Sequence, residues 1–327
     1  MTKKLSYLLI GDPVGHEFAN NNKALKLSGL YLWKEAFRQH GKGGEINTFW
    51  RKEDLENYDI VHINYTPSNI SLPTVVRNEL GTDSDTKLVI NVDLDVSHWS
   101  ASWAYHINEL MRELPLADVV FHVEPHGQEA LTHLLDRKIA VLPHPVDVTN
   151  LYDHIKAERE PVIGSIFHRY TGETMTHYIS QKNIPMRRIL FGYTPIAKQS
   201  MVANAGMFDQ IFMQKGFTEH IQEFSKIAIG CDLYSGYTFG RAVVEMAALG
   251  IPSVVSNTIA ASNYLFPDTT VSPFDTRGAE KMFMKLDQDI DFANMVIKQA
   301  HDLCGWYNLK NSYDRFVKMC QQEDTIA

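Results

Sequence analysis

Three absences narrow what this chain of 327 residues can be. Its three cysteines, Cys231, Cys304 and Cys320, lie far apart and form no CxxC pair, so we expect a reduced, cytoplasmic setting with neither a disulfide framework nor a structural zinc site. No stretch reaches 18 apolar residues, so we expect no membrane span. The net charge of −8 gives no indication of nucleic acid as a partner, although it leaves room for a local basic patch.

Metal-site and dinucleotide-binding motifs are also missing. There is no HExxH sequence, and no GxGxxG sequence follows the first apolar run. His122 and His126 have a spacing that can place two metal ligands on one helix face, but His122 is expected to end a strand. We therefore expect no metal site, and a dinucleotide-dependent oxidoreductase lacks support.

What is present is an alternation of short β-branched runs with longer amphipathic ones, which is typical of α/β proteins with parallel sheets. The periodicity predicts a helix over residues 24–39 that ends before Gly41, with one face formed by residues at helical spacings: Leu27, Leu30, Tyr31, Lys34 and Phe37. The expected strands are Tyr7–Ile10, Ile46–Trp50, Ile60–Ile63, Leu88–Val92, Val119–Val123, Ile139–Leu142, Val162–Phe167, Ile189–Tyr193, Ile227–Ile229 and Ser253–Ser256.

The order of these segments predicts two α/β domains. Residues 1–150 form the first and residues 151–300 the second, with a polar linker near residues 148–160 and a helical tail over residues 301–327. Ligands of open parallel sheets bind beyond the carboxyl ends of the strands, so the chemistry is expected in the loops that follow the strands.

Residues 235–257 are the most informative segment. A loop that contains glycine runs into a helix, which Gly250 caps before the next strand. Backbone N–H groups of Thr238, Phe239 and Gly240 are expected to point out of the helix start, where the positive end of the helix dipole can hold a phosphate.

Glu245 lies about one and a half turns into this helix, among apolar neighbours. A carboxylate there can accept two hydrogen bonds from vicinal hydroxyls, such as those of a ribose. The alternative is a polar residue on an exposed helix face. A carboxylate in a helix that is apolar nearly all round rarely lacks a partner, but the residues alone leave both interpretations open.

The segment resembles the donor-binding region of GT-B-fold nucleotide-sugar glycosyltransferases, especially the large retaining family with two glutamates separated by seven residues. Thr238-Phe239-Gly240, Glu245 and the stretch from Gly250 to Val255 match that family's pattern. At the position of the first glutamate the chain has Tyr237. Because that glutamate faces the donor sugar in the family, the replacement bears on sugar specificity and on the retaining mechanism.

The resemblance implies a GT-B-like fold, with two Rossmann-like domains whose parallel sheets face each other across a cleft. It assigns the acceptor to residues 1–150 and the nucleotide-sugar donor to residues 151–300, and it returns the helix of residues 301–327 to the first domain. In the stretch from Ile163 to Arg169, it makes Arg169 the contact for the donor phosphates. The nucleotide sugar, expected as a UDP-sugar, is then a co-substrate, and no cofactor is expected.

Asp93, Asp95 and His98 follow a predicted strand of the first domain and are the candidate catalytic residues. Relatives place a histidine near this position, close to the donor sugar. A carboxylate at the cleft could deprotonate an acceptor hydroxyl, or it could cap the following helix.

The loop after the first strand contains Gly11, Gly15 and His16, which we expect to contact the donor. Its two glycines allow close approach of the backbone to a ligand, but a turn with a surface histidine is the more frequent outcome.

The sequence thus predicts a hexosyl- or pentosyltransferase whose acceptor is a glycan, a lipid or a small molecule. One alternative is a glycosyltransferase that acts on a modified base in DNA. Another is a non-catalytic module that binds a sugar nucleotide or a partner and retains the fold, an alternative that the absence of the first glutamate favours. The oligomeric state is left open.

Overall fold

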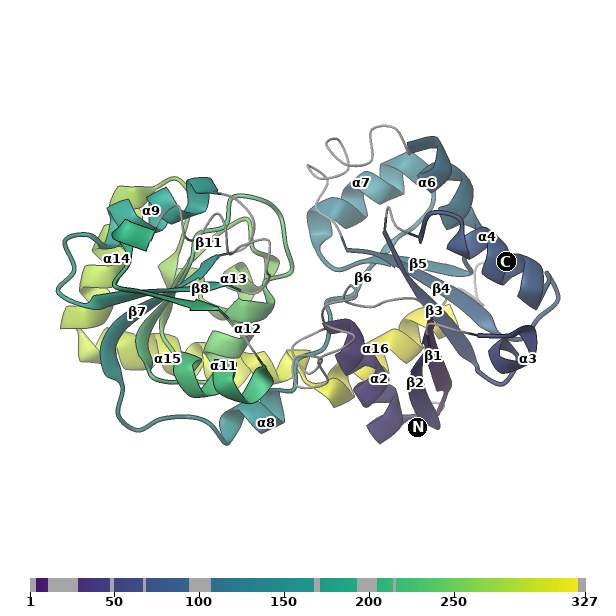
Figure 1. Cartoon of the computed structure of the whole chain (residues 1–327), viewed down its shortest axis with the longest axis horizontal. Coiled ribbons are helices and arrows are strands. Elements are labelled where there is room, and N and C mark those ends of the chain that lie inside the picture. Colours follow the sequence, from purple (N-terminus) through teal and green to yellow (C-terminus); the bar gives the residue numbers. More distant parts are fainter. Residues whose placement is uncertain are drawn as a thin grey trace. The chain divides into compact units, whose positions relative to one another are not determined.

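The structure, a computed structural model, describes residues 4–10, 29–47, 50–66, 69–93, 107–167, 171–192, 205–213 and 216–322. The chain divides into two compact units (Figure 1). Unit 1 consists of Met1–Pro145 together with Tyr307–Ala327, and unit 2 consists of Val146–Trp306. The predicted limits, 1–150, 151–300 and 301–327, differ from these units by a few residues.

Unit 1 contains a parallel sheet with the strand order β2-β1-β3-β4-β5-β6. Its strands are β1 (Ser6–Ile10), β2 (Gly43–Asn47), β3 (Ile60–Tyr65), β4 (Lys87–Val92), β5 (Val119–His122) and β6 (Ala140–Val141). Its helices are α2 (Gly29–His40), α3 (Lys52–Leu55), α4 (Leu72–Leu80), α6 (Ile107–Glu113), α7 (Pro125–Leu135) and α16 (Leu309–Gln322).

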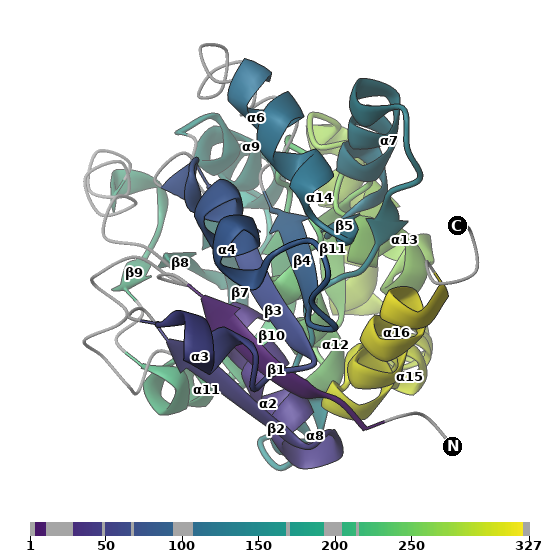
Figure 2. The same ribbon diagram turned by 90° about the vertical axis from the view of Figure 1, so that its right-hand side faces the viewer.

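Apolar side chains alternate along the strands of unit 1 and so build a core on each face of the sheet. Helices α2 and α16 cover one face, where Trp33, Phe37 and Phe316 pack on Tyr7 and Phe121. Helices α3, α4, α6 and α7 cover the other face. Figure 2 shows α2 and α16 beside the strands of this sheet.

Unit 2 contains a second parallel sheet with the order β12-β11-β10-β7-β8-β9. Its strands are β7 (Glu160–Phe167), β8 (Arg187–Gly192), β9 (Gln210–Met213), β10 (Ile227–Asp232), β11 (Ser253–Ser256) and β12 (Thr270–Val271). Its helices are α8 (Val148–Tyr152), α9 (Thr171–Gln181), α11 (Phe217–Phe224), α12 (Arg241–Ala248), α13 (Ala260–Leu265), α14 (Thr276–Gln288) and α15 (Ile290–Cys304).

The two sheets are the two common forms of the doubly wound fold. Counted from its own first strand, the sheet of unit 2 has the order 3-2-1-4-5-6 in reverse, as in dinucleotide-binding domains. The strand order reverses between β7 and β10 in unit 2 and between β1 and β3 in unit 1. Ligands of such sheets bind at these reversal points, beyond the carboxyl ends of the strands.

The predicted strand over Ile46–Trp50 is wrong in position, because β2 is Gly43–Asn47. Glycine has a low strand propensity, but here packing against α2 requires Gly44. A Cβ atom on Gly44 would lie 2.3 Å from the carbonyl oxygen of Lys34 in α2. The expected linker is also partly helical, since it contains α8, which packs on α12.

Helix α2 ends at His40, directly before Gly41, but its buried face differs from the predicted one. The buried residues are Leu30, Leu32, Trp33, Ala36 and Phe37. The helix packs on the sheet and also on α16, so it buries two faces instead of the single face that periodicity indicated.

Candidate functional site

The loop that follows β10 leads into α12 beside the reversal point of the sheet in unit 2. Gly240 is the residue before the helix and has a φ of 89°, in the left-handed region that favours glycine. A Cβ atom there would lie 2.1 Å from Cγ2 of Ile259. Both the backbone conformation and the available space therefore require glycine at position 240, where the sequence motif has it.

The loop before α12 is hydrogen-bonded to the segment that follows β11. The backbone N–H of Thr238 donates to Thr258 at 3.4 Å, and the N–H of Ala260 donates back to the carbonyl of Thr238 at 2.9 Å. The N–H of Ala261 donates to Phe239, which is buried. The expectation of an open N–H at Thr238 is thus wrong, because this group pairs with the neighbouring loop.

The carbonyl of Tyr234 joins the same two loops. It accepts hydrogen bonds from the hydroxyls of Ser256, at 2.6 Å, and Thr258, at 2.5 Å. The segment between β10 and α12 is therefore fixed at both of its ends, and the helix N-terminus has a defined place at the carboxyl edge of the sheet. Tyr237, which stands where the related pattern has a glutamate, is 37% exposed.

Gly250 ends α12 as the sequence predicts. Its φ is 68°, its N–H donates to Ala247, and the N–H of Ile251 donates to Met246 at 2.8 Å. These two hydrogen bonds form a Schellman motif, which closes the carbonyl end of the helix.

Glu245 is buried in unit 2, with only 1% of the residue exposed. Its Oε1 accepts a hydrogen bond from Nε of Arg241, one turn earlier, at 2.8 Å. Its Oε2 lies 3.5 Å from Nε2 of His220, which comes from α11. Arg241 and His220 are therefore among the partners of this carboxylate, and the exposed helix face considered from the sequence is wrong.

Burial and these partners act on Glu245 in opposite directions. Burial raises the pKa of the Glu245 carboxyl, while the charge of Arg241 and the contact with His220 lower it, and the net effect is a lowered pKa. Glu245 is thus a carboxylate at neutral pH despite its burial. The ion pair also offsets an unfavourable charge. The start of a helix carries the positive end of the dipole, so the cation of Arg241 is destabilising there unless an anion such as Glu245 balances it.

Asp93 directly follows β4 in unit 1, and its side chain is 31% exposed. Both of its carboxylate oxygens lie 3.0 Å from Nε2 of His144. The other ring nitrogen of His144, Nδ1, lies 3.0 Å from the indole Nε1 of Trp33. Three residues from distant parts of the sequence thus form one chain of hydrogen bonds.

This chain determines which nitrogen of His144 bears the proton. The indole N–H of Trp33 can only donate, so Nδ1 of His144 accepts and Nε2 donates to Asp93. The arrangement aims the Nε2–H of His144 at a partly exposed carboxylate. Gly29 makes room for the imidazole, since a Cβ atom on Gly29 would lie 2.4 Å from Cβ of His144.

A second polar chain lies inside unit 1. His62 is fully buried, with Nδ1 at 2.6 Å from the hydroxyl of Tyr7 and Nε2 at 2.7 Å from Oδ1 of Asn91. The amide of Asn91 donates to Asn64 at 2.8 Å. Burial lowers the pKa of His62 to about 3, so this histidine is neutral. It forms part of the rigid base on which the end of β4 rests.

Several predicted site residues lie outside the described residues: Gly11, Gly15, His16, Asp95, His98 and Arg169. In the sequence Gly11 comes directly after β1 and Arg169 comes two residues after β7, and these two strands lie at the reversal points. Their predicted roles stay predictions.

The residues that sequence reasoning missed are Arg241, His220, His144 and Trp33. Arg241 had a signal, because an arginine four residues before a glutamate on a helix predicts a contact. The other three had none, because their partners are distant in sequence. In unit 1 Trp33 lies 111 positions from His144, and His144 lies 51 positions from Asp93. In unit 2 His220 and Glu245 lie on different helices.

Metal ligands do not converge in the part of the chain that the structure describes: no three His, Cys, Asp or Glu side chains there are placed to hold an ion. His122 ends β5, as expected, and contacts the carboxylate of Glu124 at 3.4 Å. Glu124 in turn accepts from the backbone N–H groups of His126 and Gly127, so this cluster caps α7.

Within the described ranges, every helix also falls short of the length or apolar character that a membrane crossing requires.

Comparison with known proteins gives similarity in structure alone. No protein-family model matches the sequence, and no curated protein matches it significantly. Among solved structures, sucrose-phosphate synthase from Thermosynechococcus elongatus is 15% identical, with a TM-score of 0.68 over 99% of this chain and 100% of that one. Anabaena HepE, in complex with UDP and glucose, is 14% identical, with a TM-score of 0.67 over 97% of this chain and 99% of that one.

A third structure, described as trehalose-6-phosphate from E. coli bound with UDP-2-fluoro glucose, is 11% identical, with a TM-score of 0.64 over 97% of this chain and 99% of that one. At such identities the likeness shows the fold. The chain has the GT-B fold of these proteins, with two parallel-sheet Rossmann-like domains, and the expected fold class is confirmed.

Proposed function

We propose that the protein is a glycosyltransferase that takes a sugar from a nucleotide-sugar donor. The observation that carries the proposal is the start of α12: a glycine in the left-handed conformation opens a helix at the carboxyl edge of the sheet of a GT-B fold. Arg241 and Glu245 follow within that helix. In this proposal unit 2 binds the donor and unit 1 the acceptor, and the nucleotide sugar needs no further cofactor.

The donor diphosphate is assigned to the N-terminus of α12. The first N–H groups of a helix have no intrahelical partners, and the dipole is positive there. Arg241 adds a full positive charge at the first helical position. Negative charge grows on the leaving diphosphate in the transition state, so these groups stabilise that state more than the ground state.

The ribose of the donor is assigned to Glu245, on condition that Arg241 moves. In the structure Oε1 of Glu245 is occupied by Arg241. A diphosphate at the helix start competes for the same guanidinium, and its capture releases Oε1 to accept from the ribose hydroxyls. His220 continues to hold Oε2, 3.5 Å away, so the carboxylate keeps one partner during the exchange.

Asp93 is assigned to the reacting sugar. The carboxylate accepts the proton of the acceptor hydroxyl if the enzyme inverts, or supports the positive charge on the sugar ring if it retains. The hydrogen bond from Nε2 of His144 favours the charged carboxylate. It thus suits the electrostatic role well and moderates the strength of the base.

The donor to test first is a UDP-sugar, because two of the similar structures contain UDP or a UDP-sugar analogue. The acceptor remains a glycan, a lipid or a small molecule, with a modified DNA base as the alternative. Tyr237, at the position of the first glutamate of the related pattern, favours a second candidate function: a module that binds the sugar nucleotide without transferring the sugar.

Calorimetry of the full chain with UDP, GDP, ADP and CDP, followed by donor hydrolysis with the matching sugars, tests the proposal. We expect one nucleoside diphosphate to bind and its sugar nucleotide to be hydrolysed slowly without acceptor. Binding without hydrolysis or transfer would favour the non-catalytic module. Failure of every nucleotide to bind would refute both.

A further inference from the structure

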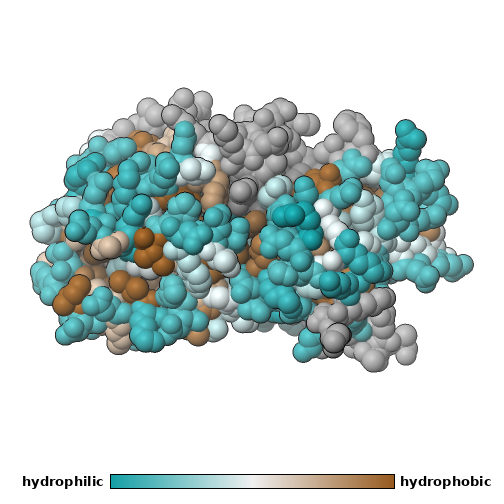
Figure 3. All heavy atoms as spheres, turned by 90° about the horizontal axis from the view of Figure 1, so that it is seen from below, coloured by the Kyte–Doolittle hydropathy of each residue, from teal (hydrophilic) through white to brown (hydrophobic). Residues whose placement is uncertain are grey.

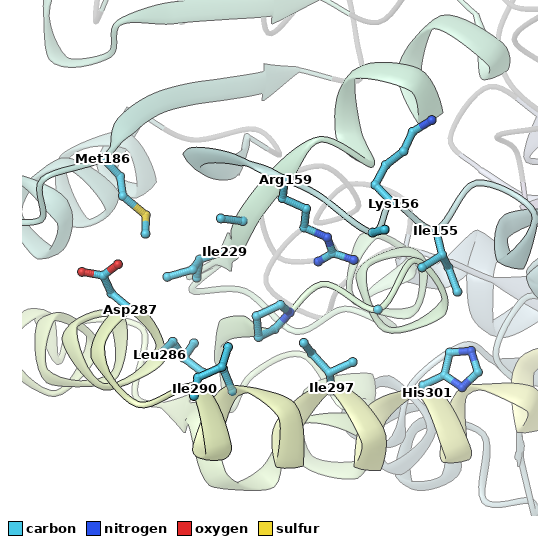
Figure 4. A pocket seen from close by; sticks show the side chains of 15 residues that line it. Ile155, Lys156, Arg159, Met186, Ile229, Leu286, Asp287, Ile290, Ile297 and His301 are labelled. Atoms are coloured by element: carbon cyan, nitrogen blue, oxygen red, sulfur yellow. The ribbon is translucent and has the colours of Figure 1, made fainter.

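A pocket of about 510 Å³ lies at the opposite edge of the sheet in unit 2 from the start of α12 (Figure 4). Arg159 and Met186 line it just before β7 and β8 begin, and Pro252 lines it just before β11. Its volume falls within the range of about 300–1,000 Å³ that is usual for small-molecule sites. No residue of the candidate donor site contributes to it.

Apolar side chains form most of this pocket. Those from the sheet and from α14 and α15 include Met186, Ile229, Leu286, Ile290 and Ile297. Ile290 is 70% exposed, which is costly for a side chain of this size unless something covers it. Figure 3 shows hydrophobic atoms gathered among polar ones on the lower face of unit 2.

Arg159 brings a guanidinium to the pocket, and this group has no anionic partner among the described residues. Its Nη2 donates to the carbonyl of Leu249 at 2.7 Å, while Nη1 is buried and makes no hydrogen bond to the described residues. No carboxylate in the described part of the chain pairs with it. Burial is the cause that lowers the pKa of the Arg159 guanidinium. A cation shielded from water without a counter-charge destabilises the protein, so an anion bound here would be stabilised.

The other charged groups of the pocket do not neutralise Arg159. Asp287 lies beside Met186, away from the guanidinium, and the amino group of Lys156 points away from it (Figure 4). The ring of His301 packs against Tyr152 in a tilted arrangement, with 4.5 Å between the ring centroids. The pocket therefore offers the guanidinium of Arg159 next to an apolar surface, while the second cation of its lining, Lys156, is turned away from that guanidinium.

We propose that this pocket binds a small amphipathic carboxylate. The apolar chain of the ligand lies on Ile290 and Ile297 of α15, and its carboxylate accepts hydrogen bonds from Arg159. A guanidinium matches the two oxygens of a carboxylate in geometry, and one guanidinium suits a monoanion better than a phosphate dianion. Because Arg159 also holds the carbonyl end of α12 at Leu249, the ligand and the proposed donor lie at opposite ends of one helix.

Decanoate, below its micelle concentration, is the probe for the full chain. We expect saturable binding by calorimetry, and shifts of the methyl signals of Ile229, Ile290 and Ile297 in isoleucine-labelled protein. Arg159→Gln should weaken decanoate binding at least tenfold and leave decanol binding unchanged. Arg187→Gln, which removes an exposed arginine at the same edge of the sheet, is the matched control and should bind decanoate as the native chain does.

Ile290→Glu is a second variant. Because Ile290 is exposed, the substitution should leave the fold intact, and its negative charge should weaken decanoate binding. The proposal is overturned if decanoate does not bind, if Arg159→Gln binds it with native affinity, or if the shifted methyl groups lie elsewhere. Tighter binding of decyl phosphate than of decanoate would overturn the assignment to a carboxylate. Sedimentation that shows a dimer formed through Ile290 would replace the ligand by a second copy of the chain.

Discussion

Asp93 is the carboxylate on which the proposed chemistry depends most directly. Asp93→Asn preserves its shape and its ability to accept from His144 but removes the charge. We expect the rate of transfer to fall about a hundredfold or more, with unchanged affinity for the nucleotide, because the charge acts on the reacting sugar. Stopped assays of sugar transfer together with calorimetry measure the two quantities separately. A fully active variant would shift the role to Asp95 or His98.

Trp33 acts on Asp93 through His144 and is a positioning residue. Trp33→Phe keeps an aromatic ring but removes the N–H that fixes the His144 tautomer. We expect a rate loss smaller than that of Asp93→Asn, with unchanged affinity for the nucleotide, because the imidazole that contacts Asp93 loses the partner that fixes its tautomer. A loss of rate that comes with a lower midpoint of urea unfolding would indicate a packing defect.

Arg241 links the proposed phosphate site to Glu245. Arg241→Gln should weaken binding of the nucleoside diphosphate by about 1.5–3 kcal/mol, the usual value of a hydrogen bond to a charged group. It should also destabilise unit 2, since it removes the ion pair between Arg241 and the buried Glu245. Arg188→Gln, which breaks an ion pair with Asp209 elsewhere in unit 2, controls for loss of charge. Unchanged nucleotide affinity would remove Arg241 from the site.

His62 gives unit 1 a defined response to pH. Its folded pKa of about 3 is below the ordinary value of 6.5, so as the pH falls below 6.5 the unfolded chain takes up a proton that the folded chain does not. Stability is therefore lost on acidification, at up to about 1.4 kcal/mol per pH unit. Urea unfolding at about pH 7 and about pH 5 should show a smaller loss for His62→Gln, which keeps one acceptor and one donor. Equal losses in the two proteins would contradict this.

Among the elements, α12 has the strictest local requirement. Gly240→Ala places a methyl group against Ile259 and forces φ of 89° on alanine. We expect a loss of about 1–3 kcal/mol in the stability of unit 2. Gly305→Ala is the matched control, with an ordinary φ of −56° and open space around its Cα. Chemical denaturation of the two variants should separate strain at the helix start from a general effect of alanine.

The division of the whole chain between its units gives α16 a structural role. Tyr313, Phe316 and Val317 of this last helix belong to the core of unit 1, together with Trp33 of α2. A chain that ends at Trp306 should therefore lose the cooperative unfolding of unit 1, because several large apolar side chains lose their cover. Unit 2 should keep its own transition. A chain that ends at Gln322 is the control, and an intact unit 1 in the shorter chain would refute the prediction.

The sequence by itself determined most of the strands and the boundaries of α12, because these depend on local chemistry. Runs of valine and isoleucine favour strands, Gly240 and Gly250 supply the left-handed conformations at both ends of α12, and Gly41 follows the last residue of α2. The strands β2, β9 and β12 lack such a run or are short, and the sequence did not predict them in place. The same local patterns are what the motif from Thr238 to Val255 consists of. This is why the fold class could be predicted from so few matching residues.

The tertiary structure alone decided the partners of the candidate site. His144 meets Asp93, and His220 meets Glu245, only because strands and helices distant in sequence end at the same edge of a sheet. The helix and strand preferences of individual residues do not predict such contacts. Strand β2 began at glycines for the same reason: the close approach of α2 required small residues, and this contact overrode the weak strand preference of the residues themselves.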